Sequence, residues 1–168
     1  DEKIGSCRFS DITIFSFHPV KIITTAEGGM AVTNDLSLNK KLKLFRSHGI
    51  SSSHEDMKPQ PIEEIWNYQQ IVLGFNYRMT EMQAALGISQ IKRLDEFVKK
   101  RHAIAIRYDN ELNKLPILTP WQHLDCYSAY HLYPIQIEQS RCSITQLELY
   151  NRMKASNINV NLHYIPVY

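Results

Sequence analysis

Long apolar runs are absent from this sequence, and so is an excess of charge of one sign. No window of the 168 residues approaches the about 18 uninterrupted apolar residues typical of a membrane span. The chain starts with polar residues rather than an apolar leader, and 19 lysines and arginines stand against 17 aspartates and glutamates. These absences argue against a membrane protein and give no electrostatic case for nucleic acid. We expect a cytoplasmic location.

Cysteine and glycine are both scarce. The three cysteines, Cys7, Cys126 and Cys142, are an odd and widely spaced set, whereas a disulfide framework favours an even and dense one. No pattern of cysteines and histidines has the spacing of metal ligands, so we predict no metal site. We expect the cysteines to be small buried side chains in a reducing compartment. Two of the six glycines are adjacent, at Gly28–Gly29.

What remains is the composition of an ordinary globular domain. Apolar residues make up 43% and charged residues 21%, which argues against intrinsic disorder. β-branched and aromatic residues, with alternation, predict strands at 11–17, 20–25, 30–33, 130–137 and 158–162. The glycine pair places a tight turn at 26–29, between the second and third strands. The class is therefore α/β.

Helical periodicity and capping residues predict the helices. The first helix is expected to begin at an N-cap of Asn34 or Asp35 and to stop at Gly49. A capping box of Thr80 with Gln83 begins the second, which runs through Leu94, and a third helical pattern runs from Ile104 to Pro116. The fourth begins at a capping box of Ser143 with Gln146 and has a left-handed end at Asn157. The polar stretch 51–64, which carries two prolines, is expected to be a surface loop. The charge runs at 40–41 and 99–101 are expected to be solvated helix faces.

Lys21 and Ser16 are the first candidate functional residues. Lys21 lies between apolar residues ahead of the glycine pair, and partial desolvation favours the neutral amine needed for a Schiff base. Taken alone, a strand lysine is more often a solvated edge residue. The hydroxyl of Ser16 suits a phosphate oxygen, although a turn residue bonded to its own backbone is about as common.

A second group of candidates comes later in the chain. Arg78 offers a planar fork for a carboxylate or phosphate, and Asn76 offers a short amide donor. His163 and Tyr164 form a polar pair at an expected strand end, where histidine could move a proton or bind an anion. For each of these, a structural role at the surface is the better interpretation in isolation.

The order of these motifs resembles the DegT/StrS-type nucleotide-sugar aminotransferases, which use pyridoxal phosphate and have the aspartate-aminotransferase fold. The resemblance covers nearly the whole chain. It is carried by the segments Phe15-Ser-Phe-His-Pro-Val-Lys-Ile-Ile-Thr-Thr-Ala-Glu-Gly-Gly-Met30, Arg46-x-His48-Gly49, Gly74-Phe-Asn-Tyr-Arg-Met79, Ala84-Ala85-x-Gly87, His131-Leu-Tyr133 and His163-Tyr-x-Pro166. It implies a fold type I fragment, with the end of the large α/β domain at 1–100 and part of the small α+β domain at 101–168.

The resemblance also implies roles for the candidates. Lys21 would bind pyridoxal 5'-phosphate covalently and move the proton during amino transfer, and Ser16 would hold the cofactor phosphate. Asn76 would reach the cofactor phosphate of the neighbouring subunit, which implies a homodimer with a shared active site. Arg78 would receive the carboxylate of the amino donor. His163 and Tyr164 would contact the donor or the sugar.

Within the family, the sequence around Lys21 most resembles that of enzymes that move an amino group from glutamate to C4 of a UDP-linked 4-keto-6-deoxy-N-acetylhexosamine, for pseudaminic acid-type surface sugars. Other nucleotide-sugar 3- or 4-aminotransferases share these sequence motifs and are the alternative. A sugar dehydratase of the family is a further alternative, but such relatives usually carry histidine at the position of Lys21. The family's acidic partner of the cofactor lies before this segment. We therefore expect a fragment of a longer protein, or else an inactive remnant that only dimerises or binds nucleotide sugar.

Overall fold

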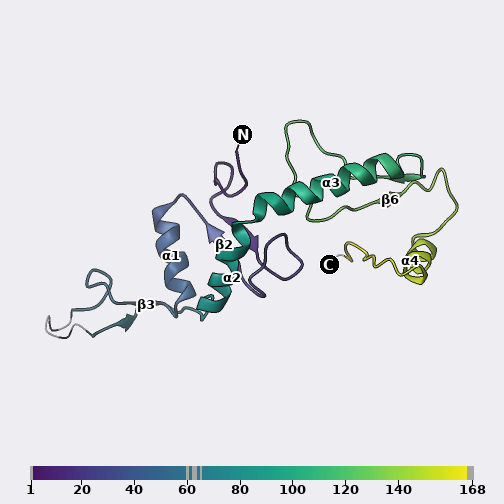
Figure 1. Cartoon of the computed structure of the whole chain (residues 1–168). Coiled ribbons are helices and arrows are strands. Elements are labelled where there is room, and N and C mark those ends of the chain that lie inside the picture. Colours follow the sequence, from purple (N-terminus) through teal and green to yellow (C-terminus); the bar gives the residue numbers. More distant parts are fainter. Residues whose placement is uncertain (1, 60, 62–63, 65, 166–168) are drawn as a thin grey trace. The chain divides into compact units, whose positions relative to one another are not determined.

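The computed structural model describes residues 2–59, 61, 64 and 66–165 (Figure 1). The chain divides into two units, Asp1–Arg93 and Leu94–Tyr168. The domain boundary predicted between 100 and 101 falls inside helix α3 (Leu94–Leu112), which begins the second unit. The assignment of the two segments to a large and a small domain stays a prediction.

The first sheet pairs β1 (Thr13–Ser16) with β2 (Gly29–Val32) in antiparallel register, with Thr13 opposite Val32 and Ser16 opposite Gly29. The hairpin predicted between 20–25 and 30–33 is therefore wrong. Residues 20–25 do not form a strand, because their backbone bonds go to Phe17 and His18 next to β1 and not across to 30–33. The Thr25 amide donates to the Phe17 carbonyl at 3.0 Å and the Thr24 hydroxyl at 2.9 Å.

Helix α1 (Leu36–Arg46) follows β2 and begins as predicted. Asp35 caps it by accepting from the amides of Ser37 and Leu38, and the Leu38 bond is the main cause of the lowered pKa of the Asp35 carboxyl. The chain leaves the helix through Gly49, whose φ of +69° suits glycine and supports the predicted stop.

The predicted loop at 51–64 is partly tied to α1. Strand β3 (Ile50–Ser51) pairs with β4 (Gln69–Gln70), and these short strands bracket the loop. Asp56 accepts from Lys40 Nζ at 2.5 Å and from the Ser51 hydroxyl at 3.2 Å, and Met57 is buried. Lys40 is therefore an ion-pair partner as well as a surface residue, while residues 60, 62 and 63 lie outside the described part of the loop.

Helix α2 (Glu81–Ile91) confirms the predicted capping box. The Thr80 hydroxyl accepts from the Gln83 amide, and the Gln83 side chain accepts from the Thr80 amide at 2.9 Å. The helix ends before Leu94, where α3 begins, so the two helices are divided earlier than the apolar pattern predicts.

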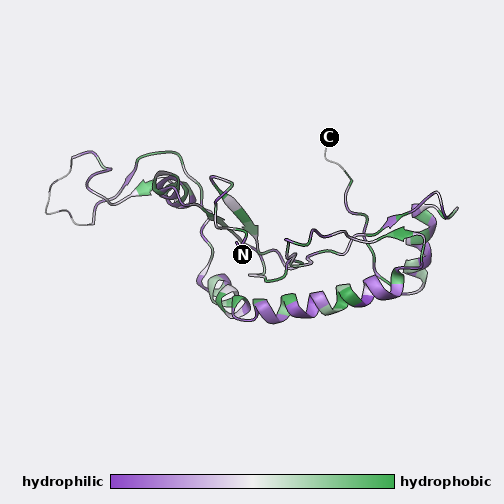
Figure 2. Ribbon diagram, turned by 90° about the horizontal axis from the view of Figure 1, so that it is seen from above, coloured by the Kyte–Doolittle hydropathy of each residue, from purple (hydrophilic) through white to green (hydrophobic). Residues whose placement is uncertain are grey.

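The second unit contains α3, the strand pair β5 (Ile117–Leu118) and β6 (Gln136–Ile137), and α4 (Gln146–Ala155). Hydrophobic and hydrophilic residues alternate along the turns of α3 (Figure 2). The predicted pattern from Ile104 is only part of this helix. Of the predicted strand 130–137 only the last two residues pair, and 158–162 forms no strand within the described chain.

The N-terminus of α4 differs from the prediction by two residues. Thr145 and Glu148 form the capping box, in place of Ser143 and Gln146. Thr145 donates to the Glu148 carboxylate from its amide at 2.8 Å and from its hydroxyl at 2.9 Å. Asn157 follows the helix with φ +58°, which confirms the predicted left-handed end.

Few of the described residues are buried, namely Thr25, Gly49, Met57, Val98 and Ala105. The expectation of buried cysteines is wrong: Cys126 is exposed, and Cys7 and Cys142 are only half-buried. Among the described residues, no cluster of potential ligands could hold a metal ion, and no helix has the length and apolar character for a membrane crossing.

Candidate functional site

Lys21 is carried by a closed loop, residues 17–28, that connects β1 to β2; we call it the lysine loop. Its two ends are joined where the Phe17 amide donates to the Gly28 carbonyl at 2.8 Å, and Phe17 also accepts from Thr24 and Thr25. Strand pairing thus fixes both ends of the loop, and Lys21 lies between them. Lys21 itself is half-buried and lies outside any strand, so it is not the strand-edge lysine of the alternative interpretation.

His18 connects Lys21 to Ser16. The Lys21 amide donates to the His18 carbonyl at 2.9 Å, and the His18 amide donates to Ser16 Oγ at 3.4 Å. Across the loop, His18 Nε2 lies 3.9 Å from Glu27 Oε1. Ser16 is therefore the last residue of β1, with its hydroxyl accepting from local backbone, and this exposed hydroxyl still has a proton to donate to an anion. The half-buried Lys21 and the exposed Ser16 come from the same end of β1.

Thr25 is a buried residue within the lysine loop and was not predicted as a site residue. It is only 2% exposed, and its hydroxyl donates to the Glu27 carbonyl at 2.7 Å. A Cβ on Gly28 would overlap the Thr25 hydroxyl and approach Met79 Cε to 2.8 Å. A Cβ on Gly87 of α2 would lie 2.9 Å from Thr25 Cγ2. The sequence carries no signal for this role, because the proximity of both glycines to Thr25 arises only in the fold.

The segment that carries Asn76 and Arg78 is bonded to the end of α1. The Phe75 amide donates to the Phe45 carbonyl at 2.7 Å, and the Tyr77 amide donates to Arg46 at 3.0 Å. Asn76 forms a bridge with Ser47. The two backbones can come this close because Gly74 has no Cβ. A Cβ at this position would overlap the Gly49 amide nitrogen. The predicted motifs Arg46-x-His48-Gly49 and 74–79 thus form one structural element.

Asn76 and Arg78 alternate in this segment with two aromatic residues. Phe75 and Tyr77 stack on each other with ring centroids 4.9 Å apart. Both Asn76 and Arg78 are exposed. Arg78 immediately precedes Met79, which contacts the lysine loop at Gly28. The structure therefore brings Arg78 to the same part of the first unit as Lys21.

His163 and Tyr164 belong to the second unit. Their side chains are exposed, and their rings lie against each other with centroids 3.5 Å apart. No strand places this pair, in contrast to the prediction, and Pro166 of the same motif lies outside the described residues.

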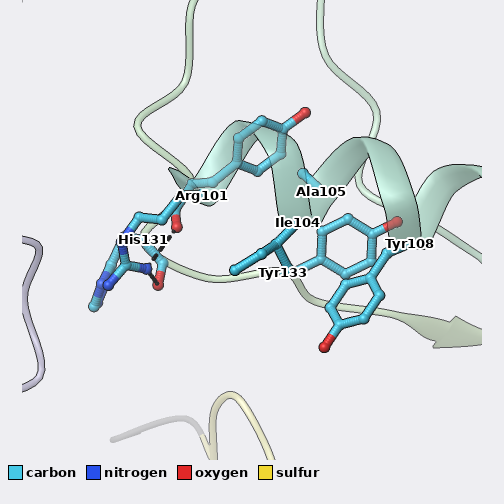
Figure 3. Close-up of a pocket in the computed structure, with 7 residues that line it drawn as sticks. Arg101, Ile104, Ala105, Tyr108, His131 and Tyr133 are labelled. Carbon is cyan, nitrogen blue, oxygen red and sulfur yellow. Dashed lines mark hydrogen bonds between the residues drawn. The ribbon is translucent and has the colours of Figure 1, made fainter. Parts of the chain in front are cut away.

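The second unit has a hollow of about 130 Å³ beside α3 (Figure 3). Arg101 donates to the carbonyl oxygens of Tyr130 at 2.9 Å and His131 at 3.3 Å, so it is not simply part of a solvated face. The Tyr133 hydroxyl donates to Asp109 at 2.6 Å. Burial, and then this bond, raise the pKa of Tyr133 to about 12. The hollow is smaller than the about 300 Å³ of ordinary ligand pockets, and we interpret it as part of the packing of this unit.

The candidate residues of the first unit share a chemical character. An amine, a hydroxyl, an amide and a guanidinium are all hydrogen-bond donors. Such a set suits ligands with phosphate or carboxylate groups, and an amine in this company can also attack a carbonyl carbon.

Comparison with known proteins agrees with this chemistry. The model of the DegT/DnrJ/EryC1/StrS aminotransferase family matches residues 1–168. The chain is 40% identical over 169 residues to the UDP-4-amino-4,6-dideoxy-N-acetyl-beta-L-altrosamine transaminase of Campylobacter jejuni, covering 99% of this chain and 41% of that protein. It is 36% identical over 167 residues to the spore coat polysaccharide biosynthesis protein SpsC of Bacillus subtilis, covering 98% and 42% of the two chains.

The same fold occurs in a solved structure. Helicobacter pylori PseC, described as an aminotransferase involved in the biosynthesis of pseudoaminic acid, matches with a TM-score of 0.83 and 35% identity, over 100% of this chain and 42% of that one. The chain thus spans about two fifths of the length of the relatives it matches. The predicted fold, the fold type I fragment of a sugar aminotransferase, is confirmed. The chain belongs to the DegT/DnrJ/EryC1/StrS aminotransferase family.

Proposed function

We propose that these residues supply the lysine-bearing part of a pyridoxal-phosphate-dependent sugar aminotransferase. The observation that carries this proposal is the closed loop between β1 and β2, in which His18 bonds both the Lys21 amide and the Ser16 hydroxyl. An amine can condense with the aldehyde of the cofactor, and a hydroxyl near the same strand end can donate a hydrogen bond to its phosphate. Family membership over residues 1–168 and the solved pyridoxal-phosphate form of a putative Streptococcus pneumoniae sugar aminotransferase support the choice of cofactor.

The residues of this chain would divide the work as follows. Lys21 Nζ would hold the aldehyde carbon of the cofactor and, once released, move a proton between the reacting carbons. The Ser16 hydroxyl would donate to the cofactor phosphate. Arg78 would bind a carboxylate of the amino donor through its planar fork. When bound, pyridoxal phosphate supplies the electron sink that none of these side chains provides.

The proposed reaction moves an amino group from glutamate to the C4 keto group of a UDP-linked 4-keto-6-deoxy-N-acetylhexosamine, in a bacterial surface-sugar pathway of the pseudaminic acid type. The names of the Campylobacter and Helicobacter relatives support a UDP-linked amino sugar as the product class. Other nucleotide-sugar aminotransferases of the family remain the alternative, because the C4 position rests on those names.

Assembly and location are part of the same proposal. Asn76 is exposed on a segment fixed to the end of α1, a placement that leaves its amide free to reach a second molecule. We assign it to the cofactor phosphate of a neighbouring subunit in a homodimer with a shared active site. His163 and Tyr164, in the segment assigned to the small domain, would contact the donor or the sugar. The protein would act in the cytoplasm, where nucleotide sugars are made.

The test uses the complete gene product that contains these residues. Mixed with pyridoxal phosphate, it should develop the absorbance band of a lysine-bound cofactor, and Lys21→Ala should lose this band. Lys41→Ala, a change of an exposed lysine on α1, is the matched control and should keep it. A band unchanged in Lys21→Ala contradicts the lysine assignment. Product analysis with glutamate and a panel of UDP-ketosugars then tests the substrate, since a C3 product contradicts the proposed position.

A further inference from the structure

Thr25, at 2% exposed, is the largest fully buried side chain of the described residues, and it belongs to the loop that carries Lys21. Three of its groups are engaged at once. Its amide donates to Phe17, its hydroxyl donates to Glu27, and its methyl carbon Cγ2 faces Gly87 of α2. The residue thus joins both halves of the lysine loop to a helix.

The contact with α2 leaves no spare room. A Cβ built on Gly87 would lie 2.9 Å from Thr25 Cγ2, closer than packed carbon atoms approach. The obstructing atom belongs to a buried, β-branched side chain, which has few alternative rotamers. The Thr25 side chain therefore has no other rotamer that makes room for a larger residue at position 87, and the Thr25 backbone would have to move instead.

A movement of the Thr25 backbone would reach Lys21. The Thr25 amide and the Thr24 hydroxyl both end on the Phe17 carbonyl, and the Phe17 amide in turn holds Gly28. Lys21 is four residues from Thr25 inside this closed circuit, and its own amide is bonded to His18. We propose that Thr25 and Gly87 form a positioning pair that sets the distance of the lysine loop from α2 and so aims the Lys21 amine. The proposal rests on the proposed function for its catalytic meaning, but not for its geometry.

Four variants of the complete gene product test the pair. Gly87→Ala adds the obstructing methyl, and Thr25→Ser removes Cγ2 while it keeps the hydroxyl bond to Glu27. The double variant combines the added methyl with the space made for it. Ser89→Ala is the control, because it introduces alanine at an exposed position of the same helix without adding a Cβ. Alanine favours a helix over either residue, so no variant is expected to unfold α2.

The first readout needs no bound cofactor. Each protein, free of cofactor, is treated briefly with acetic anhydride, and the acetylation rate of Lys21 is followed by peptide mass spectrometry. Gly87→Ala should change this rate by about threefold or more, and the double variant should return it to the Thr25→Ser value. Ser89→Ala should match the wild type. A Lys21 rate in Gly87→Ala equal to that in Ser89→Ala overturns the proposal, as does a double variant that stays like Gly87→Ala.

The second readout uses the loaded enzyme. Gly87→Ala should lower kcat about tenfold, the factor that corresponds to about 1.4 kcal/mol in a barrier, with KM for glutamate within about twofold. Recovery in the double variant distinguishes positioning from a general loss of structure, which a second substitution would not repair. If the wild type binds no cofactor at Lys21, the proposed function fails, while the acetylation rates still decide the positioning pair.

Discussion

Tyr133 shows how a single residue is controlled by its surroundings. Its hydroxyl donates to Asp109 of α3, and its ring meets that of Tyr108 edge-on at 5.1 Å. Burial and the neighbouring carboxylate both disfavour the phenolate, which raises the pKa of Tyr133 to about 12 from an ordinary 10.0. This residue therefore holds a proton in the folded chain that the unfolded chain would release.

The pH dependence of stability follows from this difference. Because the folded pKa lies above the unfolded value, the contribution of Tyr133 is complete below pH 10.0 and is lost as the pH rises toward about 12. Tyr133→Phe should remove this dependence and lower the free energy of unfolding at pH 8 by about 1.5–3 kcal/mol, the range for a bond to a charged group. Urea unfolding at pH 8 and pH 11 measures both effects. A mutant whose loss is as large at pH 11 as at pH 8 contradicts this account.

Arg78 provides a second prediction at the residue scale. If its guanidinium binds the carboxylate of the amino donor, Arg78→Ala should raise KM for glutamate about thirtyfold or more, the factor for about 2 kcal/mol. Attachment of the cofactor at Lys21 should persist, because Arg78 acts on the donor. Arg78→Lys should recover only part of the loss, since ammonium cannot make the paired bonds of the fork. Steady-state kinetics that show an unchanged KM for glutamate would remove this role.

At the scale of elements, helix starts depend on which threonine or serine forms the reciprocal bonds. In α4 those bonds join Thr145 and Glu148, and Thr145 rather than Ser143 is the N-cap. Thr145→Ala should cost the helix start about 1 kcal/mol, which corresponds to about fivefold faster hydrogen exchange across α4. Ser143→Ala, the matched change at the position first predicted, should leave that exchange unaltered. Equal effects of the two substitutions would contradict the observed cap.

Local signals in the sequence predicted some elements well. The Asp35 cap, the Thr80 box and the left-handed Asn157 each follow from side chains that bond to backbone within a few residues. The lysine loop could not be read in this way. Residues 20–25 have the β-branched composition of a strand, yet their hydrogen bonds go to Phe17, and nothing local in the sequence reveals that partner.

The candidate site also contains residues that the sequence predicts and one that it does not. Lys21, Ser16, Asn76 and Arg78 are residue types with obvious chemistry, and a family resemblance singled them out. Thr25 was missed, because its importance lies in contacts with Gly28 and with Gly87, which is far along the chain. Position in the fold, rather than residue type, identifies a residue of this kind.

At the scale of the whole molecule, the chain leaves much apolar surface uncovered. On α2 alone, Met82 is 83% exposed and Ile88 58% exposed, whereas only five of the described residues are buried. Expressed alone, residues 1–168 should therefore self-associate or precipitate, because large apolar patches drive association. Gel filtration with light scattering measures this. A clean monomer at 19.6 kDa would show that these surfaces need no cover.

The central claim is that the Lys21 amine is the group that binds the cofactor. The most direct measurement is borohydride reduction of the complete gene product loaded with pyridoxal phosphate, followed by peptide mapping. We predict the pyridoxyl mass on Lys21, in the loop that connects β1 to β2, and its loss when the protein is denatured before loading. The same mass on a different lysine, or on none, would contradict the account.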